Sequence, residues 1–386
     1  MDPMIIHRRR WATLGVLCVS LLIIGLDNTV LNVALATLQR ELDATAGQLQ
    51  WIVDSYTLAF AGLLLLAGAW GDKYGRRVAL IAGLAVFGVS SVWAALCTTP
   101  EQLIAARGLM GIGGAMIMPS TLSILTNSFT DPRERKTAIG IWAGVSGIGI
   151  AAGPALGGYL LDQFHWSSVF YINIPVVIIG LIGTVLIVAE SRDVAAPKLD
   201  LVGGLLSVVG LVALVWAIIE APGAGWSDPK VLIGFSVAAV TLAAFALWEL
   251  RIPHPMLDMR FFKNRRFSIP SISITLVFFV LLGAAFFLSL FMQTVLGYGA
   301  LEAGIRLLPI AAGLVFGAPL AMAVAQRIGE KIPITLGMLM LAVSFVVIAG
   351  STVDTGYGRV FTSIFIMGFG ISFAMTPATE AVMGSL

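Results

Sequence analysis

The sequence has few charged residues and very few cysteines and histidines. Only 11% of its 386 residues are Asp, Glu, Lys or Arg, whereas a soluble domain carries roughly 25%. Its two cysteines and three histidines show no metal-ligand spacing, and no Walker sequence or nucleophile elbow is present. These absences argue against a metal protein, an enzyme and direct use of ATP. The net charge of only +2 argues against a nucleic-acid partner. We therefore expect no enzymatic activity, no metal and no cofactor.

Long apolar runs dominate the sequence instead, and hydrophobic residues make up 58% of it. About 20 apolar residues cross a bilayer, and a crossing must be helical because unpaired backbone groups are costly in lipid. The fold class predicted is therefore an all-α polytopic membrane protein with twelve spans. The predicted spans are 11–37, 49–71, 78–97, 102–126, 138–161, 168–189, 202–221, 229–250, 267–297, 302–325, 332–350 and 358–386.

The basic residues orient these spans. If residues 1–10 form a cytoplasmic N-terminus, eighteen of the 23 Lys and Arg residues fall in inside segments, three in outside segments and two within spans. This bias follows the positive-inside rule. We expect a multi-pass monomer in the inner or plasma membrane, with the lipid bilayer as its main surroundings.

Two short internal repeats indicate how the spans are grouped. Gly71–Arg77 resembles Ala325–Lys331, and Met110–Pro119 resembles Met367–Pro377. Both matches are shifted by eight spans rather than six, so the second half should begin at the ninth span.

This register predicts an inserted helix pair between two bundles. It also leads us to expect a C-terminally incomplete fourteen-span protein, with four of six helices in the second bundle. A complete six-plus-six protein explains the repeats less well. The predicted domains are an N-terminal six-helix bundle (11–189), the inserted pair with its linkers (190–266) and the C-terminal bundle (267–386).

Three charged residues lie inside the first six predicted spans, where ionised side chains cost several kcal/mol and usually mark ion or proton pathways. Asp27, Asp54 and Arg107 all fall in the outer halves of their spans, and we predict a proton-coupling site there. The alternative is a structural Asp–Arg pair that holds helices together. Asp27 shares one helix face with Asn28 and Asn32, so this face should line a polar cavity. The predicted substrate cavity comprises Asn28, Asn32, Trp51, Tyr56 and Met118.

The loop GAWGDKYGRR (Gly68–Arg77) is predicted to be a conformational latch. Asp72 has the wrong charge for a helix C-terminus, so it needs a partner, either the neighbouring arginines or another helix N-terminus. Gly75 permits the tight turn. The alternative is a solvated loop that only sets topology. The predicted latch residues are Gly68, Asp72, Gly75, Arg76 and Arg77.

The fifth span carries the glycine-rich segment GIGIAAGPALGG, which ends at Gly158. Gly149, Gly153 and Gly157 repeat every four residues and form a smooth face that lets another helix approach closely. Pro154 removes a backbone hydrogen bond and bends the helix. A simple packing seam is the alternative to a functional motif.

Three further charges are weaker candidates. Glu302 and Arg306 are one turn apart, where either an i,i+4 pair or an outer gate would fit. Glu380 should lie near the inner interface, so we favour an ordinary interfacial glutamate over a second proton site.

These motifs together resemble those of the major facilitator superfamily, in particular the fourteen-span drug:proton antiporters of the EmrB/QacA type. GAWGDKYGRR matches the loop motif between the second and third spans, and the glycine-rich segment matches the antiporter motif of the fifth. LDNTVLNVAL matches the first-span motif, with Ala36 where a proline is usual. Arg107 and Gly111 match the fourth-span motif, with Met110 where a glutamine is common.

The resemblance implies alternating access by two helical bundles of inverted repeats, driven by the proton gradient. Protons would enter in exchange for a lipophilic, often cationic, drug. Asp27 would be the protonatable carboxylate and Arg107 its relay partner, while the fifth-span glycines and Pro154 would shape the rocking interface. Asp72 would meet the third helix of the second half.

Two other functions stay open from the sequence. A proton-coupled nutrient or metabolite transporter would have the same fold, although the glycine-rich fifth span argues against it. A truncated membrane protein that binds or regulates a partner without transporting is the alternative from another class.

Overall fold

A computed structural model describes residues 3–193, 200–253, 255, 257–352 and 356–383, and within these ranges the regular structure is entirely helical. This agrees with the predicted fold class. The helices are α1 (Pro3–Glu41), α2 (Ala46–Tyr74), α3 (Arg76–Leu96), α4 (Pro100–Ser128), α5 (Pro132–Gln163), α6 (Ser168–Tyr171), α7 (Asn173–Ile187), α8 (Leu201–Ala224), α9 (Pro229–Glu249), the 3₁₀-helix η1 (Met259–Lys263), α10 (Arg265–Leu290), the π-helix η2 (Phe291–Val295), α11 (Ala300–Ile328), α12 (Lys331–Ala349) and α13 (Tyr357–Met383).

Within the described residues, each predicted span lies mainly on helical structure. Residues 384–386 of the last predicted span, 358–386, lie outside the described residues. In the described part of the chain, eleven helices are long and apolar enough to cross a membrane by length and composition. The 32-residue α5 contains the span predicted at 138–161. The span predicted at 168–189 divides into α6 and α7. The span predicted at 267–297 ends in the π-helix η2, a rare form that often occurs at functional sites.

Local sequence signals explain where several helices begin. Thr45 and Gln48 form a reciprocal capping box at the start of α2. Thr99 accepts a hydrogen bond from the backbone N–H of Gln102 before α4, and Asp200 accepts one from Gly203 before α8. These side chains satisfy backbone donors that the first helical turn leaves unpaired.

The chain divides into two compact units, each of which is described separately. The first comprises Met1–Leu31, Thr37–Ala152 and Phe164–Asp258. The second comprises Asn32–Ala36, Gly153–Gln163 and Met259–Leu386, so it includes short pieces of α1 and α5.

In the first unit, α4 packs against both α2 and α3, α7 packs against α3, and α8 packs against α9 and α2. Small residues allow the closest approaches. A Cβ atom at Gly113 of α4 would lie 2.8 Å from the carbonyl oxygen of Gly83 of α3. The helices α8 and α9 correspond to the spans predicted at 202–221 and 229–250, and their assignment as an inserted pair stays a prediction.

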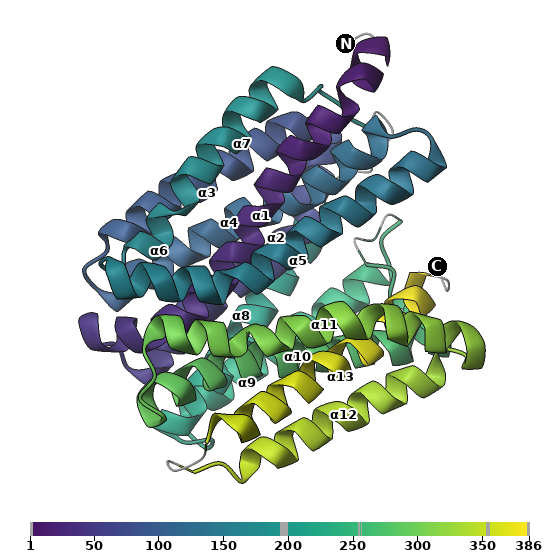
Figure 1. Cartoon of the computed structure of the whole chain (residues 1–386). Coiled ribbons are helices and arrows are strands. Elements are labelled where there is room, and N and C mark those ends of the chain that lie inside the picture. The colour runs from purple at the N-terminus through teal and green to yellow at the C-terminus, as the bar shows by residue number, and fades with distance from the viewer. Residues whose placement is uncertain (1–2, 194–199, 254, 256, 353–355, 384–386) are drawn as a thin grey trace. The chain divides into compact units, whose positions relative to one another are not determined.

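In the second unit, α13 packs against α10, α11 and α12 (Figure 1). Its core is formed by buried apolar residues from these helices, including Val277, Leu341 and Ile364. Gly313 of α11 meets Gly368 of α13 so closely that a Cβ atom at Gly313 would lie 2.8 Å from the Cα atom of Gly368.

Candidate functional site

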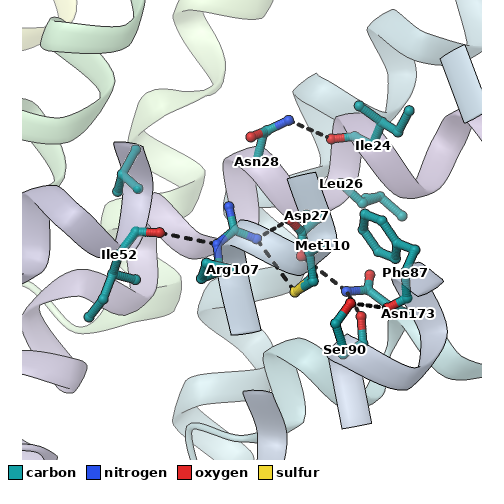
Figure 2. A network of polar contacts seen from close by, with 12 residues as sticks. Ile24, Leu26, Asp27, Asn28, Ile52, Phe87, Ser90, Arg107, Met110 and Asn173 are labelled. Carbon is teal, nitrogen blue, oxygen red and sulfur yellow. Dashed lines mark hydrogen bonds and ion pairs between the residues drawn. The ribbon is translucent and has the colours of Figure 1, made fainter. Parts of the chain in front are cut away.

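Asp27 lies buried in the middle of α1, with 3% of its surface exposed. One carboxylate oxygen, Oδ2, forms an ion pair with the Nη1 atom of Arg107 on α4. The other, Oδ1, accepts a hydrogen bond of 3.0 Å from the Nδ2 atom of Asn173 on α7 (Figure 2). The carboxylate is therefore held from two sides by residues far away in the sequence.

Arg107 is fully buried and reaches α2 as well as α1. Its Nε atom donates to the carbonyl oxygen of Ile52 at 3.2 Å, and its guanidinium carbon lies 4.4 Å from the centre of the Tyr56 ring. Nη1 also contacts the sulfur of Met110 at 3.9 Å. Sulfur is a weak hydrogen-bond acceptor, so Met110 binds the guanidinium of Arg107 more weakly than the amide oxygen of a glutamine would.

Asn173 and Ser91 are partners that the sequence reasoning missed. The Asn173 amide also donates to the hydroxyl of Ser91 on α3, at 3.3 Å, and both residues are buried. The available signal was an asparagine within a run that is otherwise almost wholly apolar. Buried polar groups need hydrogen-bond partners, so such a residue points to a partner on another helix.

The electrostatics of this cluster depend on its burial. An ion pair in a low-dielectric interior is strongly attractive, but its two charges have also lost their hydration. Adding one proton to the carboxylate would remove the attraction and leave the guanidinium without its counter-charge. No group of three His, Cys, Asp or Glu side chains in the described part of the chain could hold a metal ion.

Asp54 is not brought into this cluster. Arg107 contacts Ile52 and Tyr56, which lie two positions before and after Asp54 on α2. Residues two apart on a helix point in nearly opposite directions, so the half-buried Asp54 side chain lies on another face of α2. Its predicted part in proton coupling stays a prediction.

The residues assigned to the substrate cavity are in different settings. Asn28 donates to the carbonyl oxygen of Ile24 in its own helix at 2.9 Å. Asn32 is buried, and Trp51 is half-buried. Tyr56 is buried, and its ring forms one side of the Arg107 environment.

Met118 lies elsewhere, since eleven residues separate it from Arg107 along α4, about 16 Å of helix. It lines a cavity of about 420 Å³ together with Gly68, Asp72 and Trp142. This cavity lies beside the predicted latch rather than beside Asp27.

In the latch loop, Asp72 forms an ion pair with Arg76, with its Oδ1 atom 2.6 Å from Nε. Gly75 closes α2 with a φ of 130°, and its N–H donates to the carbonyl oxygen of Gly71. Of the two partners considered for Asp72, the structure shows the neighbouring arginine. The positive φ explains why a glycine is needed at the turn.

The segment after α7 binds this loop, which sequence reasoning did not foresee. Glu190 accepts a hydrogen bond of 3.1 Å from the backbone N–H of Arg77, in the first turn of α3. The backbone N–H of Arg76 donates to Ser191, and that of Asp193 donates to Asp72. Because Gly75 offers no side-chain cap, Glu190 supplies the missing acceptor from another segment.

The glycine face of α5 makes close helix contacts in both units. In the first unit, a Cβ atom at Gly149 would lie 3.2 Å from the carbonyl oxygen of Leu22 on α1. In the second unit, a Cβ atom at Gly158 would lie 2.7 Å from the backbone nitrogen of Leu301. Gly304 approaches the carbonyl group of Pro154, which lies inside the helix. Gly153 and Gly157 are also buried.

The weaker charged candidates lie in the second unit. Arg306 and Glu302 form an i,i+4 ion pair with 2.5 Å between Nη2 and Oε1. The rings of Tyr298 and Tyr357 lie on the guanidinium of Arg306. Glu380 is exposed.

Comparison with known proteins places this architecture in a family. Residues 17–386 match the family model described as Major Facilitator Superfamily. The chain belongs to this superfamily. Its members are transporters, so this chain is a membrane transporter and not an enzyme.

Among similar proteins is the tetracenomycin C resistance and export protein of Streptomyces glaucescens, 33% identical over 378 residues, which cover 98% of this chain and 70% of that protein. The multidrug efflux pump LfrA of Mycolicibacterium smegmatis is 35% identical over 378 residues, covering 98% of this chain and 75% of the relative.

Among solved structures, a bacterial homologue of the human lysosomal transporter Spinster superposes with a TM-score of 0.65 at 18% identity. The match covers 97% of this chain and 75% of the other. At this identity the likeness supports the fold alone.

Proposed function

We propose that this protein exports lipophilic or cationic drugs in exchange for protons, by alternating access. Similar proteins are named for drug resistance and export, which supports the drug class and the direction of transport. The observation that carries the coupling is the buried Asp27 carboxylate, held between Arg107 and Asn173.

The proposed coupling step is protonation of Asp27. A proton on the carboxylate cancels the charge that holds Arg107 to α1, while Arg107 keeps its contacts with Ile52 and Tyr56 on α2. The attraction between α1 and α4 is then lost, and the two helices can move apart. Release of the proton restores the pair, so the protonation state selects between two helix arrangements.

We further assign the protein to the fourteen-span antiporter type, with a cytoplasmic N-terminus. The pair α8–α9 supports this assignment, because it lies between the two groups of repeated motifs. The Asp72–Arg76 pair and the Glu190–Asp193 segment are proposed to stabilise the latch loop in one state of the cycle.

Replacing Asp27 with asparagine tests the proposal, because the amide keeps the shape but cannot ionise. In everted vesicles with an imposed pH gradient, Asp27→Asn should lose gradient-driven transport of a cationic dye. The matched control is Glu41→Gln, which removes an exposed carboxylate from the same helix and should transport normally. Both variants must reach the membrane in equal amounts. Undiminished gradient-driven transport by Asp27→Asn would reject the proton-carrying role.

A further inference from the structure

Two tyrosine rings and a carboxylate surround the guanidinium of Arg306 in the second unit. Its central carbon lies 3.9 Å from the centre of the Tyr298 ring and 4.4 Å from that of Tyr357. Glu302, one turn earlier on α11, pairs with the same guanidinium at 2.5 Å. The three groups, here named the Tyr298–Glu302–Tyr357 cage, come from three different segments of the chain.

The walls of this cage are held by contacts that do not involve the arginine side chain. The hydroxyl of Tyr357 donates to the backbone carbonyl of Arg306 at 2.8 Å, which fixes the start of α13 against α11. The Tyr357 ring also packs edge-on against Phe361. The backbone N–H of Tyr298 donates to Met292 at 3.0 Å, immediately after Gly297 turns the chain with a φ of 70°.

Faces of aromatic rings beside a carboxylate are the chemistry that proteins use to bind organic cations. Arg306 fills the cage with a flat, delocalised cation that is covalently tied to α11. Its side chain stays partly accessible, with 26% of its surface exposed, and that of Glu302 is 49% exposed. The carboxylate side of the cage is therefore open at the protein surface.

We propose that the cage is a binding site for organic cations, at which Arg306 is a built-in competitor. An incoming delocalised or quaternary cation replaces the guanidinium between the two rings, and Arg306 moves out towards solvent. The residues of the cage belong to the second unit, whereas Asp27 belongs to the first.

This inference names a substrate class for the proposed exporter, and in that respect it rests on the proposed function. Its test uses equilibrium binding to the purified full chain in detergent, with no proton gradient. The probe is ethidium, followed by fluorescence anisotropy, with tetramethylammonium chloride as competitor and sodium chloride at equal ionic strength as the reference.

Removing the built-in competitor should strengthen binding. Arg306→Gln should lower the Kd for ethidium by about tenfold, and tetramethylammonium should compete more effectively than sodium. Tyr298→Leu, which removes one ring, should raise the Kd at least threefold in the native chain and should abolish the gain in the Arg306→Gln background. Tyr298→Phe keeps the ring and is the matched control, with a Kd within about twofold of native.

The opposite results separate a binding site from a purely structural contact. If Arg306 only fastens α11 to the neighbouring segments, Arg306→Gln lowers the thermal unfolding midpoint and leaves the Kd unchanged or higher, which overturns the proposal. If Arg306→Gln fails to fold, Tyr298→Leu still tests the cage, because it leaves Arg306 unchanged. Ring-dependent binding together with normal export by Asp27→Asn would support the cage and reject the proton role.

Discussion

The two units each contain an arginine paired with a carboxylate, and the pairs differ in almost every other respect. Asp27 and Arg107 are 80 residues apart on different helices, and their side chains are only 2% and 1% exposed. Glu302 and Arg306 are one turn apart on α11 and retain 49% and 26% exposure. The second pair is partly open at the protein surface, whereas the first is enclosed by protein.

This difference determines what each pair can do. A buried charge left without its partner is strongly destabilising, so losing one member of the Asp27–Arg107 pair should cost far more free energy than losing one member of the exposed pair. An exposed i,i+4 ion pair typically contributes less than about 1 kcal/mol to stability. Its arginine can therefore leave the two tyrosine rings at low cost. Burial makes the first pair suitable as a switch, and exposure makes the second suitable as a replaceable contact.

The sharpest test of this comparison removes one carboxylate from each pair. Asp27→Ala leaves Arg107 buried and unpaired, which should cost about 3–5 kcal/mol of stability. Glu302→Ala removes a partly exposed helix pair and should cost about 0.2–1 kcal/mol. Thermal unfolding followed by size-exclusion chromatography in detergent would measure both. Equal losses of stability in the two variants would show that the contribution of each pair does not depend on its burial.

A smaller loss of stability is expected when the packing between α4 and α2, which brings Arg107 to α2, is disturbed. Gly111 of α4 touches the backbone of Tyr56, whereas nothing lies within 4 Å of a Cβ atom at Gly108. Gly111→Ala should push α4 from α2 and cost about 1–3 kcal/mol, as overpacking does. Gly108→Ala adds the same methyl group to the same helix without a clash. A stability loss confined to Gly111→Ala, in the same unfolding assay, is the expected result.

The smallest expected effect is a response to salt. Raising the ionic strength from about 0.1 to 1 M shortens the Debye length from about 10 to 3 Å and screens exposed charges. The stability difference between native protein and Glu302→Ala should shrink by a few tenths of a kcal/mol, while that for Asp27→Ala should hardly change. A large salt dependence for Asp27→Ala would mean that water reaches the buried pair.

Much of the fold could be predicted from sequence because the bilayer restricts the choices. Apolar runs of about 20 residues must be helices, so in the described part of the chain each predicted span corresponds to helical structure. The break at Ile172 and the π-helix η2 were not predicted. Both are local departures within apolar runs, where hydropathy does not distinguish one helical geometry from another.

The candidate site was predicted less completely, for a related reason. Asp27 and Arg107 stood out because ionised groups are rare within apolar spans. Asn173 carries no charge, and Glu190 lies just after a span, near the beginning of the following segment, so neither gave a comparable signal. Their partners lie on helices that are distant in sequence, and only packing brings them together.

The sequence by itself determined that this chain is an all-helical membrane protein with charges at a few costly positions, because hydrophobicity and charge are properties of individual residues. The tertiary structure decided which of these charges meet. It paired Asp27 with Arg107 and Asn173, left Asp54 on another face of α2, and enclosed Arg306 between two tyrosine rings. Such pairings depend on helix rotation and on small residues at the contacts, which local patterns do not specify.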